Sequence, residues 1–300
     1  MRKGFTRLLA IGLSATAATF TQAQDGTAQL RKVKDVVVYE DPLFYNAFPS
    51  VVKRPDGELF VAFRRAPDLN VFGEKRWSHV DPNSYLVMVR SRDGETWTKD
   101  PELIYAHPFG GSQDPCLLQL RDGTLLCTSY GWAFIKPGGV ANLKKPLIQS
   151  EGFTFLGGYL VRSTDGGTSW QGPIYPPHIS PEVHLTPFGN GLPASNRGAL
   201  CEGESGRIFW AVAAMDNANT KKTSVHLLAS DDKGLTWTYR SPIAVDEKVH
   251  FNESSAYETP KGDIVVFLRT AKFDDQACIA RSTDGARRSS GRGWASRGIR

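Results

Sequence analysis

The chain has 300 residues, of which 40% are hydrophobic and 22% charged, so it holds enough apolar sequence for a sizeable core. Its formal net charge is +5, but residues 1–23 contribute three positive charges and residues 286–300 five, with no acidic residue in either segment. Residues 24–285 therefore carry a net charge of −3. This mildly acidic body argues against a general nucleic-acid-binding surface, because phosphate backbones are attracted by an excess of positive charge.

The N-terminal residues 1–23 have the pattern of a secretory signal peptide. Three basic residues precede the apolar run 8–20, and residues 21–23 offer a small-x-small cleavage site. The run is too short to span a bilayer, and no comparable run follows it. We therefore expect a secreted or periplasmic protein without a membrane span.

The four cysteines are too few for a disulfide scaffold in a chain of this length. Cys116 and Cys127 flank a predicted hairpin turn at Asp122 and Gly123. Pairing across that turn places Cys116 opposite Ser129, so the two cysteines are expected to lie diagonally. Both a disulfide and a pair of buried strand thiols stay open, and the thiols are the simpler interpretation.

An apolar hairpin recurs along the chain. Each copy has two short runs rich in Val, Ile, Leu and Phe on either side of a Gly-containing turn, which is typical of antiparallel strands. The copies occupy residues 48–63, 115–129, 198–214 and 254–269.

A second recurring element follows each hairpin: an apolar strand that ends in a motif resembling the Asp box, S-x-D-x-G-x-T-W. The motifs read SRDGETW at 91–97, STDGGTSW at 163–170, SDDKGLTW at 230–237 and STDGA at 282–286. In such a turn the Asp accepts backbone amides, the Gly adopts positive φ, and the Trp covers an apolar edge. We therefore predict structural, not catalytic, roles for the box aspartates Asp93, Asp165, Asp232 and Asp284.

A hairpin, a third strand, a box and a fourth strand together make one four-stranded antiparallel sheet. Successive box aspartates are 72, 67 and 52 residues apart, and helical periodicity is nearly absent. Repeated units of this size are typical of a β-propeller, in which radial closure hides the sheet edges. The predicted fold class is therefore all-β, a propeller of four-stranded blades within residues 24–285.

The hairpins and boxes resemble those of the bacterial sialidase (neuraminidase) family, whose members are six-bladed Asp-box propellers. The resemblance covers about residues 36–285 and implies a glycoside hydrolase that releases terminal sialic acid from glycans. Residues 286–300 are rich in Arg, Ser and Gly and have no strand pattern. We hypothesise that the reading frame is shifted or interrupted near Ala286, which would leave about four blades of six.

Cleavage of a sialic acid makes particular chemical demands. The sugar carries a carboxylate on its anomeric carbon, which clustered arginines would bind through charge-assisted hydrogen bonds. That carboxylate would repel a carboxylate nucleophile, so a Tyr assisted by a Glu is the workable arrangement, and a separate acid protonates the leaving oxygen.

The resemblance assigns the catalytic roles to two residues. Asp81, ten residues before the box Ser91, matches the family's general acid/base, with Asp68 as a rival and a solvated turn residue as the simpler interpretation. Glu253 and Arg269 match a catalytic Glu and a substrate-binding Arg on one hairpin. A hairpin turning at Gly262 would bring both to the same end, although an ordinary ion pair would look alike.

Further substrate contacts are implied for one of two adjacent arginines, Arg64 or Arg65, and for Asp114 at the start of the second hairpin. Ala47 departs from the family, because an Arg that binds the substrate carboxylate is expected in its place. Arg54 and Arg65 are candidates to supply that charge. The third Arg and the nucleophilic Tyr would lie in blades five and six, so we expect this chain to be inactive by itself.

The sequence predicts no metal or organic cofactor, because no histidine shows metal-ligand spacing and no Gly-rich phosphate loop occurs. The expected partners are sialylated or other acidic glycans, and neither nucleic acid nor a particular oligomeric state is expected. The leading hypothesis is a sialidase-type hydrolase. A propeller that binds or cleaves another acidic sugar and a non-catalytic carbohydrate-binding propeller remain alternatives.

Overall fold

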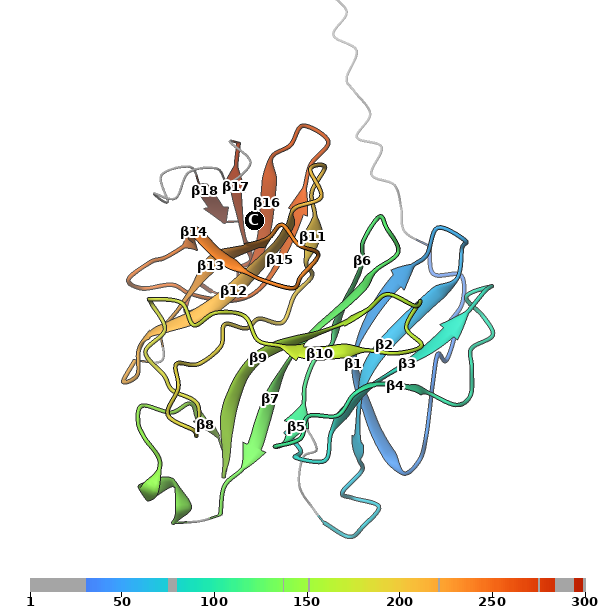
Figure 1. Ribbon diagram of the computed structural model, residues 1–300, viewed down its shortest axis with the longest axis horizontal. Helices are drawn as coiled ribbons and strands as arrows, with labels where there is room; N and C mark the ends of the chain where they lie inside the picture. Colours follow the sequence, from blue (N-terminus) through green and yellow to red (C-terminus); the bar gives the residue numbers. More distant parts are fainter. Residues whose placement is uncertain are drawn as a thin grey trace, which may run out of the picture. The chain divides into compact units, whose positions relative to one another are not determined.

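The structure is a computed structural model that describes residues 31–74, 80–136, 138–150, 152–220, 222–274, 276–283 and 294–298 (Figure 1). It divides into two units, residues 1–36 and residues 37–300. In the first unit, the described residues 31–36 form neither helix nor strand. All strands of the described residues lie in the second unit, and the signal-peptide prediction falls on residues that the structure does not describe.

The first two sheets hold the strands up to residue 174. The first sheet has the order β1-β2-β3-β4, with β1 Phe44–Lys53, β2 Leu59–Pro67, β3 Tyr85–Ser91 and β4 Glu102–Tyr105. The second has the order β10-β9-β7-β5, with β5 Gly111–Ser112, β7 Leu125–Phe134, β9 Phe153–Ser163 and β10 Gln171–Ile174. Its short strands β6 Cys116–Gln119 and β8 Gln149–Ser150 pair with β7 and β9.

The last two sheets follow the same plan. The third has the order β11-β12-β13-β14, with β11 Cys201–Glu202, β12 Ile208–Asn217, β13 Lys222–Ser230 and β14 Thr238–Ala244. The fourth has the order β15-β16-β17-β18, with β15 His250–Glu258, β16 Ile264–Ala271, β17 Cys278–Ser282 and β18 Trp294–Gly298. All strand pairs are antiparallel, so the predicted four-stranded blades are confirmed.

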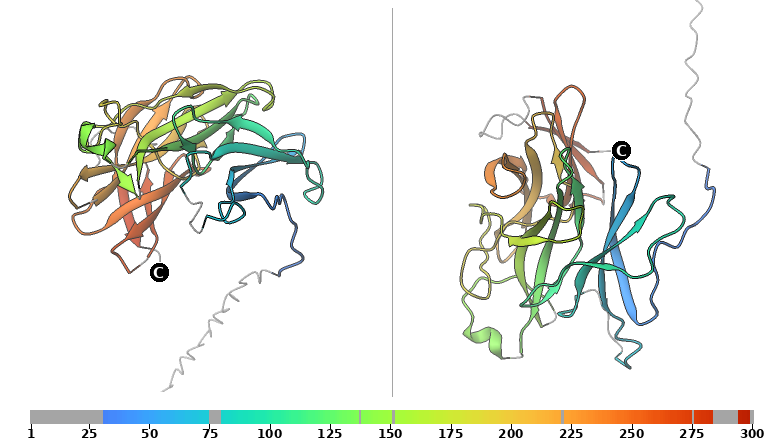
Figure 2. Two further views of the ribbon diagram at one scale, coloured as in Figure 1. Left: turned by 90° about the horizontal axis from the view of Figure 1, so that it is seen from below. Right: turned by 45° about the vertical axis from the view of Figure 1, so that its right-hand side comes forward.

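The four sheets follow one another in chain order (Figure 2). Three core clusters of the described residues lie between successive sheets, and a separate cluster that contains Val61 and Val89 lies on the other face of the first sheet. Phe60 and Met88 of the first sheet pack with Leu125 of the second, and Trp210 of the third packs with Leu126. A further cluster joins the third sheet to the fourth. Each blade therefore buries its apolar face against the next, which is how a propeller repeat stabilises sheets too small to be stable alone.

The Asp boxes fold as predicted. Asp93 Oδ1 accepts the backbone N–H groups of Glu95 and Thr96 at 2.8 and 2.7 Å. In the third box, Asp232 accepts both the N–H and the hydroxyl of Thr236 at 2.8 and 2.6 Å. These carboxylates close turns on the molecule's edge, and Asp284 lies outside the described residues.

The C-terminal segment corrects one expectation, because residues 294–298 do form a strand. β18 pairs with β17 from Ser282↔Trp294 to Cys278↔Gly298 and completes the fourth sheet. The Trp294 indole also donates a 3.2 Å hydrogen bond to Ser241 Oγ of the third sheet. Backbone pairing with an unsatisfied strand edge and one anchoring Trp therefore outweigh the weak strand propensity of the Arg/Ser/Gly-rich sequence.

The four cysteines are free thiols, so the disulfide alternative is not formed. Cys116 pairs across the hairpin with Thr128, not with Ser129, and Leu117 with Cys127. Burial raises the pKa of the Cys127 thiol, which keeps it protonated. Within the described residues the single helical turn is the 3₁₀ segment Gly139–Asn142, and no helix has the length and apolarity needed to cross a bilayer.

Candidate functional site

Glu253 and Arg269 meet at one end of the β15–β16 hairpin, as the sequence predicts. The Arg269 Nη1 atom lies 3.2 Å from Glu253 Oε1, and their side chains are 61% and 39% exposed. The hairpin register shifts between Phe251 and Ser254, so a bulge in β15 carries Glu253. Bulges commonly redirect a side chain beside a functional site.

Arg64 is the buried arginine of the predicted set. It lies on β2 with 0% exposure, and its guanidinium is 5.6 Å from the centre of the Tyr45 ring. Burial lowers the pKa of Arg64, while the negative charges of Asp114 and Asp81 oppose that shift. A buried guanidinium is tolerable because these two carboxylates compensate its charge.

Asp81 is held firmly beside the second sheet. Its Oδ1 accepts the Asn83 N–H at 2.8 Å, and its carbonyl accepts the Ser84 hydroxyl at 2.8 Å. A Cβ added to Gly111 would lie 1.7 Å from the Asp81 carbonyl oxygen, so glycine is what allows β5 to approach this loop. Asp81 is only 1% exposed, so its carboxyl is closed off from solvent.

Asp114 joins the predicted residues to two that sequence analysis missed. Tyr130 of β7 donates a 2.5 Å hydrogen bond from its hydroxyl to Asp114 Oδ2. The guanidinium of Arg197 lies 3.5 Å from the same oxygen through Nε, and Nη1 lies 3.9 Å from Glu253 Oε1. Burial, followed by the charge of Asp114, raises the pKa of Tyr130 well above its usual value, so the phenol is neutral.

The segment that carries Arg197 runs between the third and fourth sheets. The Arg197 carbonyl accepts the Ser254 N–H at 3.3 Å, and Asn196 Nδ2 donates to the carbonyls of Ala211 and Asn252 at 2.9 and 3.0 Å. A Cβ on Gly198 would lie 1.8 Å from the Ser254 carbonyl oxygen. Only glycine therefore lets this segment pack so closely on β15, and the packing fixes the backbone of Arg197.

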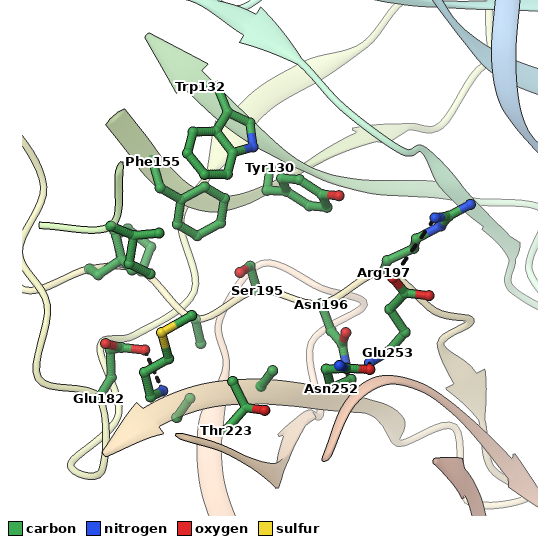
Figure 3. A pocket seen from close by; sticks show the side chains of 17 residues that line it. Tyr130, Trp132, Phe155, Glu182, Ser195, Asn196, Arg197, Thr223, Asn252 and Glu253 are labelled. Atoms are coloured by element: carbon green, nitrogen blue, oxygen red, sulfur yellow. Dashed lines mark hydrogen bonds and ion pairs between the residues drawn. The ribbon is translucent and has the colours of Figure 1, made fainter. Parts of the chain in front are cut away.

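Two pockets meet at Arg197 and Glu253. The first, of about 260 Å³, has these two residues at one side and Trp132 and Phe155 at another, with the Tyr130 hydroxyl pointing toward Arg197 (Figure 3). The second, of about 540 Å³, shares Arg197 and Glu253 and also contains Arg269. The site thus combines apolar aromatic walls with a small charged cluster, as ligand sites commonly do.

The wall of the first pocket is fixed by a buried carboxylate. Glu182 Oε1 accepts the His184 N–H at 2.9 Å and contacts His184 Nδ1 at 2.6 Å, while Oε2 accepts the Met215 N–H at 2.9 Å. Since Glu182 and Met215 both line the pocket, these bonds attach the 175–200 loop to β12.

Arg65 does not lie with the other predicted residues. Neighbouring residues of a strand point to opposite faces, and the Arg65 guanidinium stacks 3.4 Å above the Phe44 ring and pairs with Asp41 at 2.6 Å. It also donates to the Tyr85 hydroxyl. Of the two adjacent arginines offered as alternatives, Arg64 therefore lies toward Asp81 and Asp114, whereas Arg65 lies on the other face of the strand beside Asp41.

The structure also gives the positions of three other residues that the sequence analysis discussed. Arg54 pairs with Glu58 at 2.9 Å in the first hairpin's turn, so it does not replace the missing charge. Asp68 caps a turn by accepting the Asn70 N–H at 3.0 Å. Ala47 lies directly opposite Arg64 in the β1–β2 register.

The missed residues had no motif to reveal them. Arg197 lies outside every recurring hairpin strand and box, and Tyr130 lies just beyond the second hairpin segment. Among the described residues no group of three or more His, Cys, Asp and Glu is placed to hold a metal ion.

Comparisons with known proteins agree with this architecture. Residues 151–290 match the model of the BNR repeat-like domain. No curated protein matches the chain. The crystal structure of a protein of unknown function from Dyadobacter fermentans shares 65% identity over 88% of this chain and 72% of that one, with a TM-score of 0.84.

Two more distant structures share the fold alone. The NanB sialidase of Streptococcus pneumoniae is 13% identical, with a TM-score of 0.58 over 93% of this chain and 56% of that one. A family 117 glycoside hydrolase of Zobellia galactanivorans is 12% identical, with a TM-score of 0.56 over 85% and 72%. This chain thus spans little more than half of NanB. Because the two chains are 65% identical over 72% of that protein's length, this chain belongs to the same family as the Dyadobacter fermentans protein, and its residues 151–290 match the BNR repeat-like domain.

Proposed function

We propose that the protein is a glycoside hydrolase of the sialidase type and that the cluster around Arg197 and Glu253 binds the terminal acidic sugar. The observation that carries this proposal is the position of Glu253, whose carboxylate lies within 4 Å of both Arg197 and Arg269 where two pockets meet. Two guanidiniums around one carboxylate form a site that a ligand carboxylate also fits.

The remaining roles follow the chemistry of the residues. Asp81 is the proposed general acid/base, and Arg64 compensates its charge from within the first blade. Because Asp81 is 1% exposed, a substrate reaches it only when the 81–84 loop separates from β5. Asp114 and Tyr130 are proposed to contact the polar groups of the sugar, since their hydrogen-bonded pair lies beside Arg197.

The direct test is hydrolysis of a fluorogenic sialoside, with the fluorogenic glucuronide as the alternative acidic substrate. We would assay this chain beside the Dyadobacter fermentans relative, because this chain spans 72% of that protein. Release that is lost in Asp81→Asn and Glu253→Gln of the active protein supports the proposal. Sialic-acid binding without any release in either protein would contradict the hydrolase function.

A second candidate is a propeller that cleaves or binds a different acidic sugar. Ala47 favours it, because the inner strand of the first blade supplies no Arg at that position. The similarity to a family 117 hydrolase also shows that the fold is not restricted to sialidases. Preferential release from the glucuronide would select this function over the first.

A further inference from the structure

The guanidinium of Arg197 is less tightly paired than that of Arg207 on the same blade. Its nearest carboxylate oxygens lie at 3.5 Å on Asp114 and 3.9 Å on Glu253. By contrast, Arg207 holds Asp231 in a two-bond fork at 2.7 and 3.1 Å. Charge-assisted N–H···O bonds are usually about 2.7–2.9 Å long. Arg197 is therefore close enough to attract both carboxylates but forms a two-bond ion pair with neither.

The position of this guanidinium is nevertheless fixed. It lies 4.7 Å from the centre of the Phe48 ring, and Arg64 lies 5.9 Å from the same ring. Phe48 has a φ of 59°, a left-handed conformation that is uncommon for an aromatic residue, within the irregular β1 register between Ala47 and Ser50. Strained residues of this kind cluster at functional sites, where the surrounding structure holds them in place.

The two carboxylates beside Arg197 differ in how easily a ligand can displace them from its guanidinium. Asp114 Oδ2 already accepts the short bond from Tyr130, and Asp114 is 3% exposed. Glu253 is 39% exposed and is shared with the side chain of Arg269, which is 61% exposed. An incoming anion therefore competes with Glu253 for Arg197 far more easily than with Asp114.

We propose that Arg197 recognises the carboxylate of the acidic sugar, and that this carboxylate takes the place of Glu253 on the Arg197 guanidinium. Arg197 thus supplies from the third blade the positive charge that Ala47 does not supply from the first. Displaced from Arg197, Glu253 keeps its ion pair with Arg269. This inference rests on the proposed function only for the class of ligand.

The test is an equilibrium binding measurement by calorimetry with the full chain and matched probes. The probes are the methyl α-glycoside of N-acetylneuraminic acid and its carboxyl methyl ester, with methyl glucuronoside and its ester as a second pair. We expect the wild type to prefer the acid over the ester in one pair. Arg197→Met should remove that preference by roughly 10- to 100-fold, the usual worth of a charge-assisted hydrogen bond, and Arg197→Lys should retain part of it.

Glu253→Gln should change acid binding in the opposite direction to Arg197→Met, and it leaves Arg197 intact. If Glu253 competes with the ligand, its neutralisation should strengthen binding of the acid several-fold and leave the ester unchanged. Arg207→Met, which removes a surface fork on the same blade, is the control and should change neither.

Three results would overturn the inference: no acid preference in the wild type, an unchanged preference in Arg197→Met, or weaker acid binding in Glu253→Gln. Thermal unfolding identifies any variant that fails to fold. If Arg197→Met fails to fold, the binding measurement with Glu253→Gln decides. Absence of hydrolysis together with Arg197-dependent acid binding refutes the proposed hydrolase but not this inference. Hydrolysis together with an unchanged acid preference in Arg197→Met would refute this inference but not the proposed hydrolase.

Discussion

The hydroxyl of Tyr130 is hydrogen-bonded to the carboxylate of Asp114 at 2.5 Å, in the wall of the pocket that Arg197 and Glu253 complete. Tyr130→Phe removes the donor and leaves a buried carboxylate with one partner fewer. We expect a loss of about 1–3 kcal/mol in the free energy of unfolding, the usual cost of an unsatisfied buried group. Urea denaturation measures it, and a variant as stable as the wild type would show that the bond contributes little.

The backbone beside Arg197 gives a second prediction. A Cβ at position 198 would lie 1.8 Å from the Ser254 carbonyl oxygen, so Gly198→Ala should separate the segment from β15 and move Arg197. We expect a lower melting temperature and weaker binding of acidic sugars. Gly139→Ala is the matched control, because its Cβ would lie 3.5 Å from Ile135 in ordinary contact. Equal melting temperatures for the two variants would contradict the close-packing argument.

The fold was predictable because its signals are local. The Asp boxes form hydrogen bonds within a few residues, such as Asp232 to Thr236, so their sequence pattern specifies the turn directly. β18 was not predictable in this way, since its pairing with β17 depends on an available strand edge rather than on its own composition.

The site was predictable only where strand geometry determines it. Hairpin pairing brings Glu253 and Arg269 together, and strand alternation requires that Arg64 and Arg65 point apart without saying which faces the hub. Arg197 could not be found, because its place depends on contacts with residues far along the chain, such as Ser254. Tyr130 was missed for the same reason, since its partner Asp114 lies sixteen residues away, between β5 and β6.

The second Asp box should make stability depend on acidity. Hydrogen bonds from the Ser169 side chain and backbone lower the pKa of Asp165 from 3.8 to about 2. A carboxylate with a depressed pKa stabilises the fold above its unfolded pKa, and this contribution is lost as the pH falls through the folded value.

The melting-temperature difference between wild type and Asp165→Asn should therefore shrink as the pH falls from 4 toward 2. Asp100→Asn, an exposed residue outside the boxes, is the control. A difference that stays constant over this interval would mean that the Asp165 charge does not contribute to the turn.

His226 should act in a separate and higher pH interval. Its ring is 2% exposed on β13, with Nε2 2.8 Å from Ser224 Oγ and Nδ1 3.2 Å from the Tyr239 hydroxyl. Burial lowers the pKa of His226 from 6.5 to about 4, so the folded protein holds it neutral.

Below pH 6.5 the unfolded chain binds a proton at this ring that the folded protein does not accept until about pH 4. Stability contributed by the neutral ring is therefore present above pH 6.5 and lost between these values, on the order of 3 kcal/mol in total. His226→Gln should keep the hydrogen-bonding polarity and remove this slope. Urea unfolding at pH 7, 5.5 and 4.5 measures it, and parallel profiles for the two proteins would show that His226 titrates alike in the folded and unfolded chains.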